Sequence, residues 1–489
     1  MDVSKRILGA VASLLLFAGL AAADDYFGPQ NIQVSGARKT VKANFSAVAG
    51  RAAWVEVTNG ASGGSRARAV IVVLNGTRLN KRKDLNNKVA SAQFPVLLGG
   101  KNKIKFIVRG NGASVTLRVK SRSADFSRLA GYGDSIMAGF QDGSLVETYQ
   151  VWNFGSQIAD KAGAKFTLPL ITEPGLPPRY RIENGQLIIP DPNGPVGYRK
   201  NPGQDPDNLS VPGATVWTSL NVASLGSTLD PYALVLGGQR SMVGELKRRK
   251  PTFVLLWIGS NDILDMAVKT NPGSHTSLDD FKRDYENILK EIRDLGASAV
   301  AANLPDVTAI ALLRKPTDFQ VLWGVPANVL LPITKLFDTS PSPDEYLDPG
   351  EVAQIRNTVQ QFNSEIENLC KKYGVPIVDA YSMSQQWDAN GIAVGNRHLT
   401  AEWREGIFSL DGIHPSNTGH ALVANHFIAV INKAFDAGLS SVNVAAVLSQ
   451  DPNRPAHDEV GAESSITAES NFLKAALRVL THANRIKRR

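Results

Sequence analysis

Three residues whose side chains can act together on an ester carbonyl lie far apart in the sequence: Ser135, Asp411 and His414. Ser135 lies in the glycine-rich stretch GYGDSIMAGF, residues 131–140, which taken alone is equally typical of a turn before a helix. A serine hydroxyl becomes a nucleophile when a base takes its proton, and histidine is the usual base. A carboxylate three residues before a histidine can reach the imidazole and fix its tautomer. These residue types are the ones that acyl transfer to serine needs, but an Asp-x-x-His pair alone also occurs by chance in many proteins.

The other histidines lie in contexts less suited to a general base. His420 and His426 fall on a predicted final helix, residues 420–434, where a packing or surface role is expected. The remaining four lie in polar loops, a linker or the tail: His275, His398, His457 and His482. This leaves His414 as the candidate base.

The segments that must position these side chains alternate between strands and helices after residue 126. The run FVLLWI, residues 253–258, is continuously apolar, as a strand buried on both faces requires, and similar runs lie near Ala299 and Val378. Helices are predicted over 277–295, opened by a capping box at Ser277, and over 351–373. Their expected core stripes are Phe281, Tyr285, Ile288, Leu289 and Ile292, and Ile355, Val359, Phe362, Ile366 and Leu369. The pattern predicts a doubly wound parallel sheet.

Four polar segments follow the expected strands or the loops beside them. They are GYGDS at 131–135, NLSVPGATVW at 208–217, WIGSNDILD at 257–265 and SLDGIHPSNTGH at 409–420. In an open α/β sheet, ligands bind beyond the carboxyl ends of the strands. We therefore expect the four segments to converge on one site.

Taken together and in this order, the segments resemble the GDSL, or SGNH, hydrolase family. The matching blocks are Gly133-Asp134-Ser135, with Ile136 where the family name has Leu, then Gly213, then Gly259-Ser260-Asn261-Asp262, and finally Asp411-Gly412-Ile413-His414. The resemblance covers roughly residues 126–440. It implies a flavodoxin-like, three-layer α/β hydrolase domain that cleaves carboxylic esters.

The resemblance also implies a role for each matching residue. Ser135 attacks the acyl carbon, and His414 acts as base and then acid, oriented by Asp411. The oxyanion is held by the backbone N–H groups of Ser135 and Gly213 and by the side-chain amide of Asn261. Gly213 follows an atypically long loop, in which Gly203 is a less favoured substitute. Asp134 and Asp262 are expected to support the loops.

Two further stretches bear on the substrate. DFQVLWGVPANVLLPITKLF, residues 318–337, is unusually apolar for a connection and follows NLPDVT, residues 303–308, which resembles the family's fourth region. It is either an acyl-binding wall or lid, or a helix packed on the core. The Pro/Gly-rich loop 172–208 forms another rim of the site or simply lies on the surface.

Residues 1–123 are expected to precede the catalytic domain in two pieces. Lys5 and Arg6, an apolar run and Ala21-Ala22-Ala23 predict a signal peptide over residues 1–23, cleaved after Ala23, and therefore a secreted or periplasmic protein. Residues 24–123 alternate apolar and polar positions at short spacing, as in SVTLRVKS. They predict an immunoglobulin-like β-sandwich of about seven strands that acts as a brace or holds a glycan. The motif GASGG at 60–64 matches the sequence pattern of a nucleophile elbow. It is expected to lie in a loop of this part, without the preceding strand and following helix that an elbow needs.

Composition narrows the possible partners. The chain has 489 residues, a net charge of +8 with acids and bases interspersed, and Cys370 as its only cysteine. No nucleic-acid stripe, internal disulfide or cysteine-rich metal site is indicated, and no motif points to a metal or cofactor. The expected partner is an ester substrate, either an acyl lipid or an acylated glycan.

The C-terminal residues 446–489 are predicted to be a linker and a basic amphipathic tail. Phe472, Leu473, Ala476, Leu477 and Leu480 share one side of a possible helix, followed by four basic residues. Such a helix can lie on an anionic membrane, dock on the domain or fray. Function at this point has three readings: a secreted esterase or lipase, which is preferred, a carbohydrate O-acyl esterase, and a non-catalytic surface-binding protein on a hydrolase scaffold.

Overall fold

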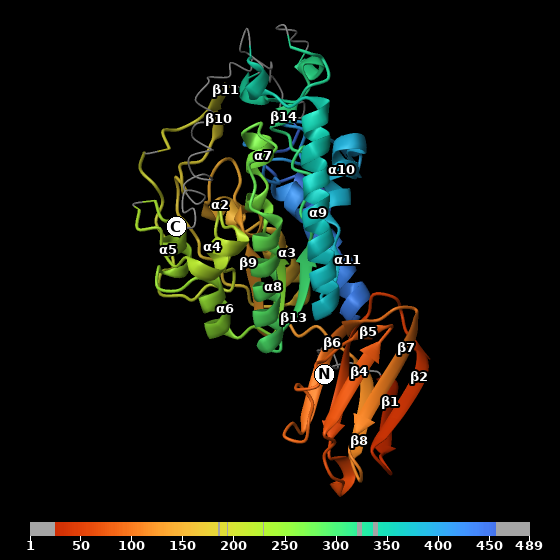
Figure 1. Cartoon of the computed structure of the whole chain (residues 1–489). Helices are drawn as coiled ribbons and strands as arrows, with labels where there is room; N and C mark the ends of the chain where they lie inside the picture. The colour runs from red at the N-terminus through yellow and green to blue at the C-terminus, as the bar shows by residue number, and fades with distance from the viewer. Residues whose placement is uncertain are drawn as a thin grey trace, which may run out of the picture.

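The computed structural model describes residues 25–455, apart from residues 184, 185, 193, 228, 320–324 and 336–340. The predicted signal peptide, residues 1–23, and the stretch 456–489 with its predicted amphipathic helix lie outside the described residues. Figure 1 shows two parts, an N-terminal part made of strands and a larger part in which helices surround a sheet.

The N-terminal part consists of two antiparallel sheets. Its described strands are β1 (Asp25–Gln33), β2 (Arg38–Ser46), β3 (Ala52–Asn59), β4 (Ala69–Leu74), β5 (Thr77–Arg78), β6 (Ser91–Leu97), β7 (Lys101–Arg109) and β8 (Ser114–Ser121). One sheet has the order β1-β8-β3-β6 and the other β2-β7-β4-β5. Val115, Leu117 and Val119 of β8 are fully buried, as the alternation predicts. The immunoglobulin-like relationship itself stays a prediction.

Two loops of this part behave as their residues require. Asn75 and Gly76, with φ of 49° and 85°, join β4 to β5, and this left-handed pair suits a two-residue hairpin. The stretch 60–64 forms a short 3₁₀ turn, η1 (Ala61–Gly63), between β3 and β4. It therefore lacks the strand-to-helix setting that a nucleophile elbow needs.

A buried arginine joins the two parts. Arg122, directly after β8, is 4% exposed and donates hydrogen bonds to the backbone oxygens of Gly374 and Ala297 and to Ser298 Oγ, at 3.0, 3.3 and 3.2 Å. Its guanidinium lies 4.4 Å from the ring centroid of Trp54 on β3. The N-terminal part is thus packed firmly on the helical part rather than tethered to it.

The centre of the larger part is a four-stranded parallel sheet. Its strands are β9 (Leu129–Gly133), β12 (Phe253–Trp257), β13 (Ser298–Ala302) and β16 (Ile377–Val378), in the order β16-β13-β12-β9. The stretch 207–211 runs beside β9, where Leu209 N–H donates to Gly131 O at 2.9 Å and Val211 N–H to Gly133 O at 3.3 Å. This extends the sheet by one more parallel segment, so the predicted α/β fold with a parallel sheet is confirmed.

Helices cover both faces of this sheet. They are α1 (Ser135–Ala138), α2 (Glu147–Gln150), α3 (Phe154–Ala162), α4 (Val216–Asn221), α5 (Pro231–Leu236), α6 (Met242–Arg249), α7 (Asp265–Val268), α8 (Leu278–Asp294), α9 (Pro349–Tyr373), α10 (Ala380–Asn390), α11 (Asn417–Phe435) and α12 (Val444–Leu448). In Figure 1, α4, α6, α8 and α9 lie in front of the sheet, and α3 and α11 lie behind it. This gives the three predicted layers.

The helix cores follow the sequence pattern. Every residue of the two predicted stripes on α8 and α9 is buried. Ser277 caps α8 by accepting from Asp280 N–H at 3.2 Å, but its hydroxyl donates to the Asp280 carboxylate instead of completing a reciprocal box. No helix of the described residues is both long and apolar enough to cross a membrane.

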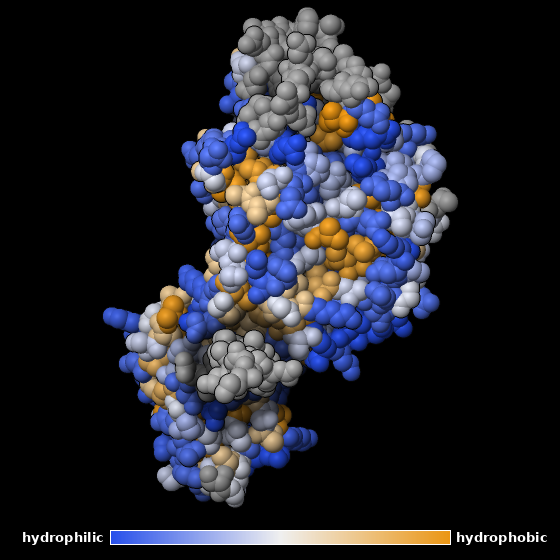
Figure 2. Space-filling model, turned by 180° about the vertical axis from the view of Figure 1, so that it is seen from behind, coloured by the Kyte–Doolittle hydropathy of each residue, from blue (hydrophilic) through white to orange (hydrophobic). Residues whose placement is uncertain are grey.

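Figure 2 shows the opposite side, where hydrophobic residues form separate patches among hydrophilic ones. Large exposed hydrophobic side chains among the described residues are Val48, Val151 and Tyr198. Single exposed hydrophobic side chains are ordinary on a protein surface. The apolar residues of the described chain are therefore mostly inside.

The remaining short elements lie in connections. They are β10 (Arg181–Glu183), β11 (Gln186–Ile188), β14 (Leu313–Arg314), β15 (Leu331–Pro332), β17 (Ile392–Val394), β18 (Arg397–Leu399) and the 3₁₀ turns η2 (Ser260–Asp262), η3 (Pro316–Phe319), η4 (Ile333–Lys335) and η5 (Pro343–Glu345).

The C-terminal stretch differs from the predicted linker. Residues 446–455 include part of α12, and Val447, Leu448, Asp451 and Asn453 are each 7% exposed or less. The Asp451 carboxylate accepts from the backbone N–H and the hydroxyl of Thr418, at 2.7 and 2.6 Å. The polar composition of the stretch suggests a linker, but its side chains instead cap the N-terminus of α11.

Candidate active site

Ser135 begins α1, and only Asp134 separates it from the end of β9. Asp134 caps this helix by accepting from Ile136 N–H at 3.1 Å. Gly133 pairs with Trp257 on β12, and a Cβ there would lie 2.3 Å from Trp257 O, so only glycine lets the strands approach. Burial raises the pKa of Asp134 to about 6, although the Ile136 amide opposes this shift. The sheet edge and the cap together hold Ser135 in place.

The structure brings the three predicted reacting side chains together. His414 Nε2 lies 2.8 Å from Ser135 Oγ, and His414 Nδ1 lies 3.0 Å from Asp411 Oδ2. All three residues are 4% exposed or less. With the Nδ1 proton donated to the carboxylate, Nε2 is free to accept the proton of the serine hydroxyl.

Asp411 is held by four N–H donors. Its Oδ1 accepts from the backbone N–H groups of Ile413 and His414, both at 2.9 Å. Its Oδ2 accepts from Gly143 N–H at 2.9 Å as well as from His414 Nδ1. Burial alone would raise the pKa of Asp411, but the His414 imidazole and the backbone donors outweigh it and hold the pKa below its usual value. The carboxylate is therefore ionised and fixed in orientation.

The two loops expected to carry oxyanion donors are tied to each other. Gly213 has a φ of 78°, and Asn261 lies in η2 after β12. The Asn261 side-chain amide donates to Ala214 O at 3.1 Å. Asp262 Oδ2 accepts from Val216 N–H at 2.9 Å. Because these loops follow neighbouring parallel segments of the sheet, Gly213 and Asn261 lie at the same edge as Ser135.

Asp262 links a third loop to this pair. Its Oδ1 accepts from the Thr276 hydroxyl at 2.8 Å. Burial raises the pKa of Asp262 to about 7, with the hydrogen bonds from Val216 and Thr276 opposing the shift. The residue thus fastens the loops that follow 207–211 and β12.

The histidines assigned to the final helix make packing contacts and form no hydrogen bond with the triad among the described residues. His420 on α11 is fully buried, neither ring nitrogen has a hydrogen-bond partner among the described residues, and burial lowers its pKa to about 3. Its ring stacks with Phe154 at 6.3 Å between centroids. His426 contacts Trp387 edge to face at 6.4 Å. His457 and His482 lie outside the described residues.

The apolar stretch 318–337 lies beside the triad loop. Leu312 N–H donates to Gly412 O at 2.8 Å, and Ile333 N–H donates to Leu312 O at the same distance. In its described residues the stretch forms η3, β15 and η4, and β15 pairs with β14. The alternative of a helix packed on the core is therefore not seen in the described part of the stretch.

The Pro/Gly-rich loop 172–208 contacts the turn 141–144, whose Gly143 N–H bonds to Asp411. Tyr180, which is 2% exposed, donates its N–H to Asp142 O at 2.8 Å. A Cβ at Gly143 would meet the Tyr180 ring at 2.5 Å. Part of the loop is therefore built into the site's support rather than lying on the surface.

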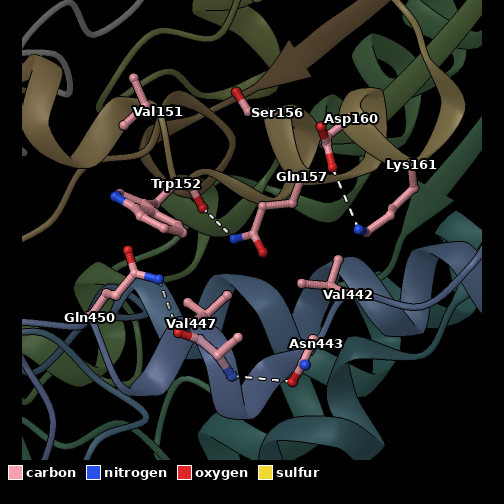
Figure 3. A pocket seen from close by; sticks show the side chains of 11 residues that line it. Val151, Trp152, Ser156, Gln157, Asp160, Lys161, Val442, Asn443, Val447 and Gln450 are labelled. Carbon is pink, nitrogen blue, oxygen red and sulfur yellow. Dashed lines mark hydrogen bonds and ion pairs between the residues drawn. The ribbon is translucent and has the colours of Figure 1, made fainter.

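A separate hollow of about 400 Å³ lies between α3 and α12 (Figure 3). Its walls combine apolar and amide side chains, among them Trp152, Gln157, Val447 and Gln450. None of the predicted site residues lines it.

Sequence reasoning missed two residues that touch the support of Asp411. Asp142 and Asn453 are buried and bonded to each other, Asn453 Nδ2 donating to Asp142 Oδ1 at 3.0 Å. The Asp142-Gly143 pair is a turn signal that could have been noticed. Nothing in the local sequence marks Asn453, because its partner is 311 residues away.

The family model of the GDSL-like lipase/acylhydrolases matches residues 131–427, and the chain belongs to this family. The match spans every predicted site residue, from Asp134 to His414. The protein is therefore a carboxylic ester hydrolase. Comparison with curated proteins gave no match.

The chain is similar at low identity to several solved structures. A family two carbohydrate esterase from Clostridium thermocellum in complex with cellohexaose is 13% identical, with 84% of this chain and 96% of that chain covered and a TM-score of 0.29. A catalytic mutant of an acetylxylan esterase from Geobacillus stearothermophilus is 14% identical, with 62% and 93% covered and a TM-score of 0.29. A Bacillus subtilis protein is 11% identical, with 80% and 79% covered and the same score. Scores this low say nothing about the substrate.

Proposed function

We propose that the protein hydrolyses carboxylic esters through an acyl-enzyme on Ser135. The observation that carries this is the unbroken chain Ser135 Oγ, His414 and Asp411, with steps of 2.8 and 3.0 Å. His414 Nε2 takes the proton of Ser135 Oγ as that oxygen attacks the acyl carbon, and then gives it to the departing alcohol. Water attacks the acyl-enzyme in the same way, and Ser135 recovers its proton.

The negative charge that develops on the carbonyl oxygen needs fixed donors. We assign this role to the backbone N–H groups of Ser135 and Gly213 and to the Asn261 amide. The hydrogen bond from Asn261 to Ala214 uses one of the two amide protons, which leaves the second for the oxyanion. Asp134 and Asp262 serve this hole indirectly, since each holds a loop that carries one of the donors.

The preferred substrate class is an ester with an acyl chain longer than acetyl. The apolar stretch 318–337 supports this, because its anchor Leu312 bonds directly to the Gly412 loop between Asp411 and His414. Among its described residues, Val329 and Leu331 are buried, so these two side chains hold the stretch against the protein rather than face an acyl chain. An O-acylated glycan is the second candidate substrate, and the assay below distinguishes it from a longer acyl ester.

The test compares p-nitrophenyl esters from acetate to palmitate with acetylated xylan, using the wild type and Ser135→Ala. We expect a rise in kcat/KM beyond acetate and loss of all turnover in the variant. A serine-reactive phosphonate should label Ser135 and no other residue. Equal slow turnover by wild type and Ser135→Ala would overturn the mechanism, and preference for acetylated xylan would move the substrate to the glycan class.

We further propose that the protein is exported with cleavage after Ala23 and that residues 24–123 brace the catalytic part. The buried contacts of Arg122 support a brace, because a freely tethered binding module would not bury a charge against its neighbour. N-terminal sequencing of the exported protein tests the cleavage, and an intact N-terminus would refute it.

A further inference from the structure

A second buried carboxylate lies behind the reacting groups. Asp142 is 1% exposed and stands in a tight turn in which Gln141 and Ser144 exchange backbone hydrogen bonds at 2.9 Å. Its φ of 51° and that of Gly143, 70°, are both left-handed. A non-glycine residue rarely holds this conformation, so the surroundings must fix it.

This turn grips the loop that carries Asp411 at three successive residues. Asp142 N–H donates to Ser409 Oγ at 3.0 Å, and Asp142 Oδ1 accepts from Leu410 N–H at 2.8 Å. Gly143 N–H donates to Asp411 Oδ2, the same oxygen that faces His414 Nδ1. A change in the turn therefore moves the oxygen that orients the imidazole.

The Asp142 carboxylate is in turn held by one side chain seven residues further along the chain and by another 311 residues away. The Tyr149 hydroxyl of α2 donates to Oδ2, and Asn453 Nδ2 donates to Oδ1 at 3.0 Å. Asn453 is itself fixed, because its N–H donates to Asp451 Oδ1 at 2.9 Å while Asp451 caps α11. Through Asn453, the segment that follows α12 thus bonds to Asp142, which lies shortly after Ser135 in the sequence.

We propose that Asp142 and Asn453 are positioning residues that set the orientation of Asp411, so that residues 449–455 are part of the catalytic assembly. The proposal rests on the proposed function only in that Asp411 orients His414. Neither residue touches the reacting atoms. Their effect passes through Leu410 and Gly143 to Asp411 Oδ2.

Several ionisable groups face Asp142 and must be counted when its charge changes. The charges of Asp411 and Asp142 repel each other, and Tyr180 also interacts electrostatically with Asp142. Tyr149, the hydrogen-bond partner of Asp142, interacts electrostatically with Asp451, and the Arg179 guanidinium lies 5.9 Å from the centroid of the Tyr149 ring. Burial first, and then the Asp411 charge, raise the pKa of Asp142 to about 7, while its hydrogen bonds oppose the rise. Removing this carboxylate therefore removes negative charge near the triad in the neutral pH range.

The experiment measures kcat, KM and the pH profile on a p-nitrophenyl ester for three variants. Asp142→Ala removes both acceptors and should lower kcat about 10- to 100-fold with KM little changed, as a misplaced catalytic group does. Asn453→Ala should lower kcat less, roughly threefold to tenfold, because Leu410 still finds its acceptor. Asp142→Asn keeps an oxygen for Leu410 and Asn453, so its kcat should recover to near wild type.

Asp142→Asn also supplies a readout that a purely structural residue would not move. Without the negative charge, protonation of the triad is less favoured, so the acid limb of kcat/KM should shift to lower pH. Asp160→Asn, at an exposed surface ion pair, is the control and should change nothing. Near-UV circular dichroism confirms that each variant is folded.

Wild-type kcat in folded Asp142→Ala and in Asn453→Ala would overturn the proposal. So would an Asp142→Asn variant that is as slow as Asp142→Ala with an unshifted profile. If Asp142→Ala does not fold, Asn453→Ala and Asp142→Asn decide the matter alone. Turnover by folded Ser135→Ala equal to that of wild type would instead show that the proposed function fails, which keeps the two failures apart.

Discussion

Replacing Asp411 by Asn tests the proposed triad through hydrogen bonds alone, because the side chain keeps its shape. The carboxylate accepts from four N–H groups, two at each oxygen. An asparagine has one carbonyl oxygen and one NH₂ group, which only donates. In either orientation its NH₂ group must therefore face two former donors.

The two orientations do not cost the same. With NH₂ toward the backbone N–H groups of Ile413 and His414, both are left without an acceptor. With NH₂ toward His414 Nδ1 and Gly143 N–H, only Gly143 is orphaned, because the imidazole can change tautomer and accept at Nδ1. Each orphaned buried donor costs about 1–3 kcal/mol, so the second orientation is favoured by about that amount.

In the favoured orientation, His414 Nε2 carries the proton and cannot take one from Ser135. The expected loss in kcat is about 10⁴-fold, the magnitude known for a triad locked in the wrong tautomer. The single orphaned N–H should lower Tm by only a few degrees, at about 2–4 °C per kcal/mol for a domain of this size. Turnover of p-nitrophenyl butyrate and a thermal melt measure the two effects, with Asp160→Asn as the control. A folded Asp411→Asn that keeps kcat within about tenfold of wild type would refute the reasoning.

Three other substitutions test separate features. Asn261→Ala should lower kcat about 10²- to 10³-fold with little change in KM on the same ester, since it removes an oxyanion donor, and an unchanged kcat would exclude that role. Arg122→Met should lower the free energy of unfolding, measured with urea, by about 2–5 kcal/mol, because three buried acceptors lose their donor. The control is Arg51→Met, which removes an ion pair between the two parts. Its partner Asp436 is exposed, so this change should lower the free energy of unfolding by under about 1 kcal/mol. Burial raises the pKa of Asp262 from 3.8 to about 7, so ionisation of this carboxyl destabilises the folded protein as pH rises from about 4 through 7. The Tm of Asp262→Asn minus the Tm of wild type should therefore increase between about pH 5 and pH 8. A difference in Tm that does not change with pH would contradict this.

The strands and helices around the site follow from local patterns. Phe253–Trp257 is apolar throughout and forms a strand buried on both faces, and Ser277 starts a helix where a cap was expected. His414 could be selected from the histidines by its context, and Ser135 and Asp411 are indicated by the order of motifs that resembles the GDSL family. Periodicity and residue type suffice for such features because they act over one turn or one strand.

The support of the site is invisible to the same reasoning. Asp142 resembles any aspartate in an Asp-Gly turn, and its burial depends on Tyr149, Leu410 and Asn453 arriving from three other segments. Residues 446–455 are polar and rich in turn formers, so composition suggests a linker. Their packing is set by Thr418 and Asp142, which are distant in sequence. Partners that meet only in the folded chain leave no local mark.

The separation of these partners along the chain has a consequence for synthesis. Ser135 and His414 are 279 residues apart, and Asp142 and Asn453 are 311 apart. The N-terminal strands and β9 leave the ribosome while the base and its support are still untranslated, and domains fold as they emerge. Ser135 is therefore synthesised 279 residues before the histidine that activates it. Catalytic competence can arise only after His414 has been synthesised, and a product that ends before His414 carries a serine without its base.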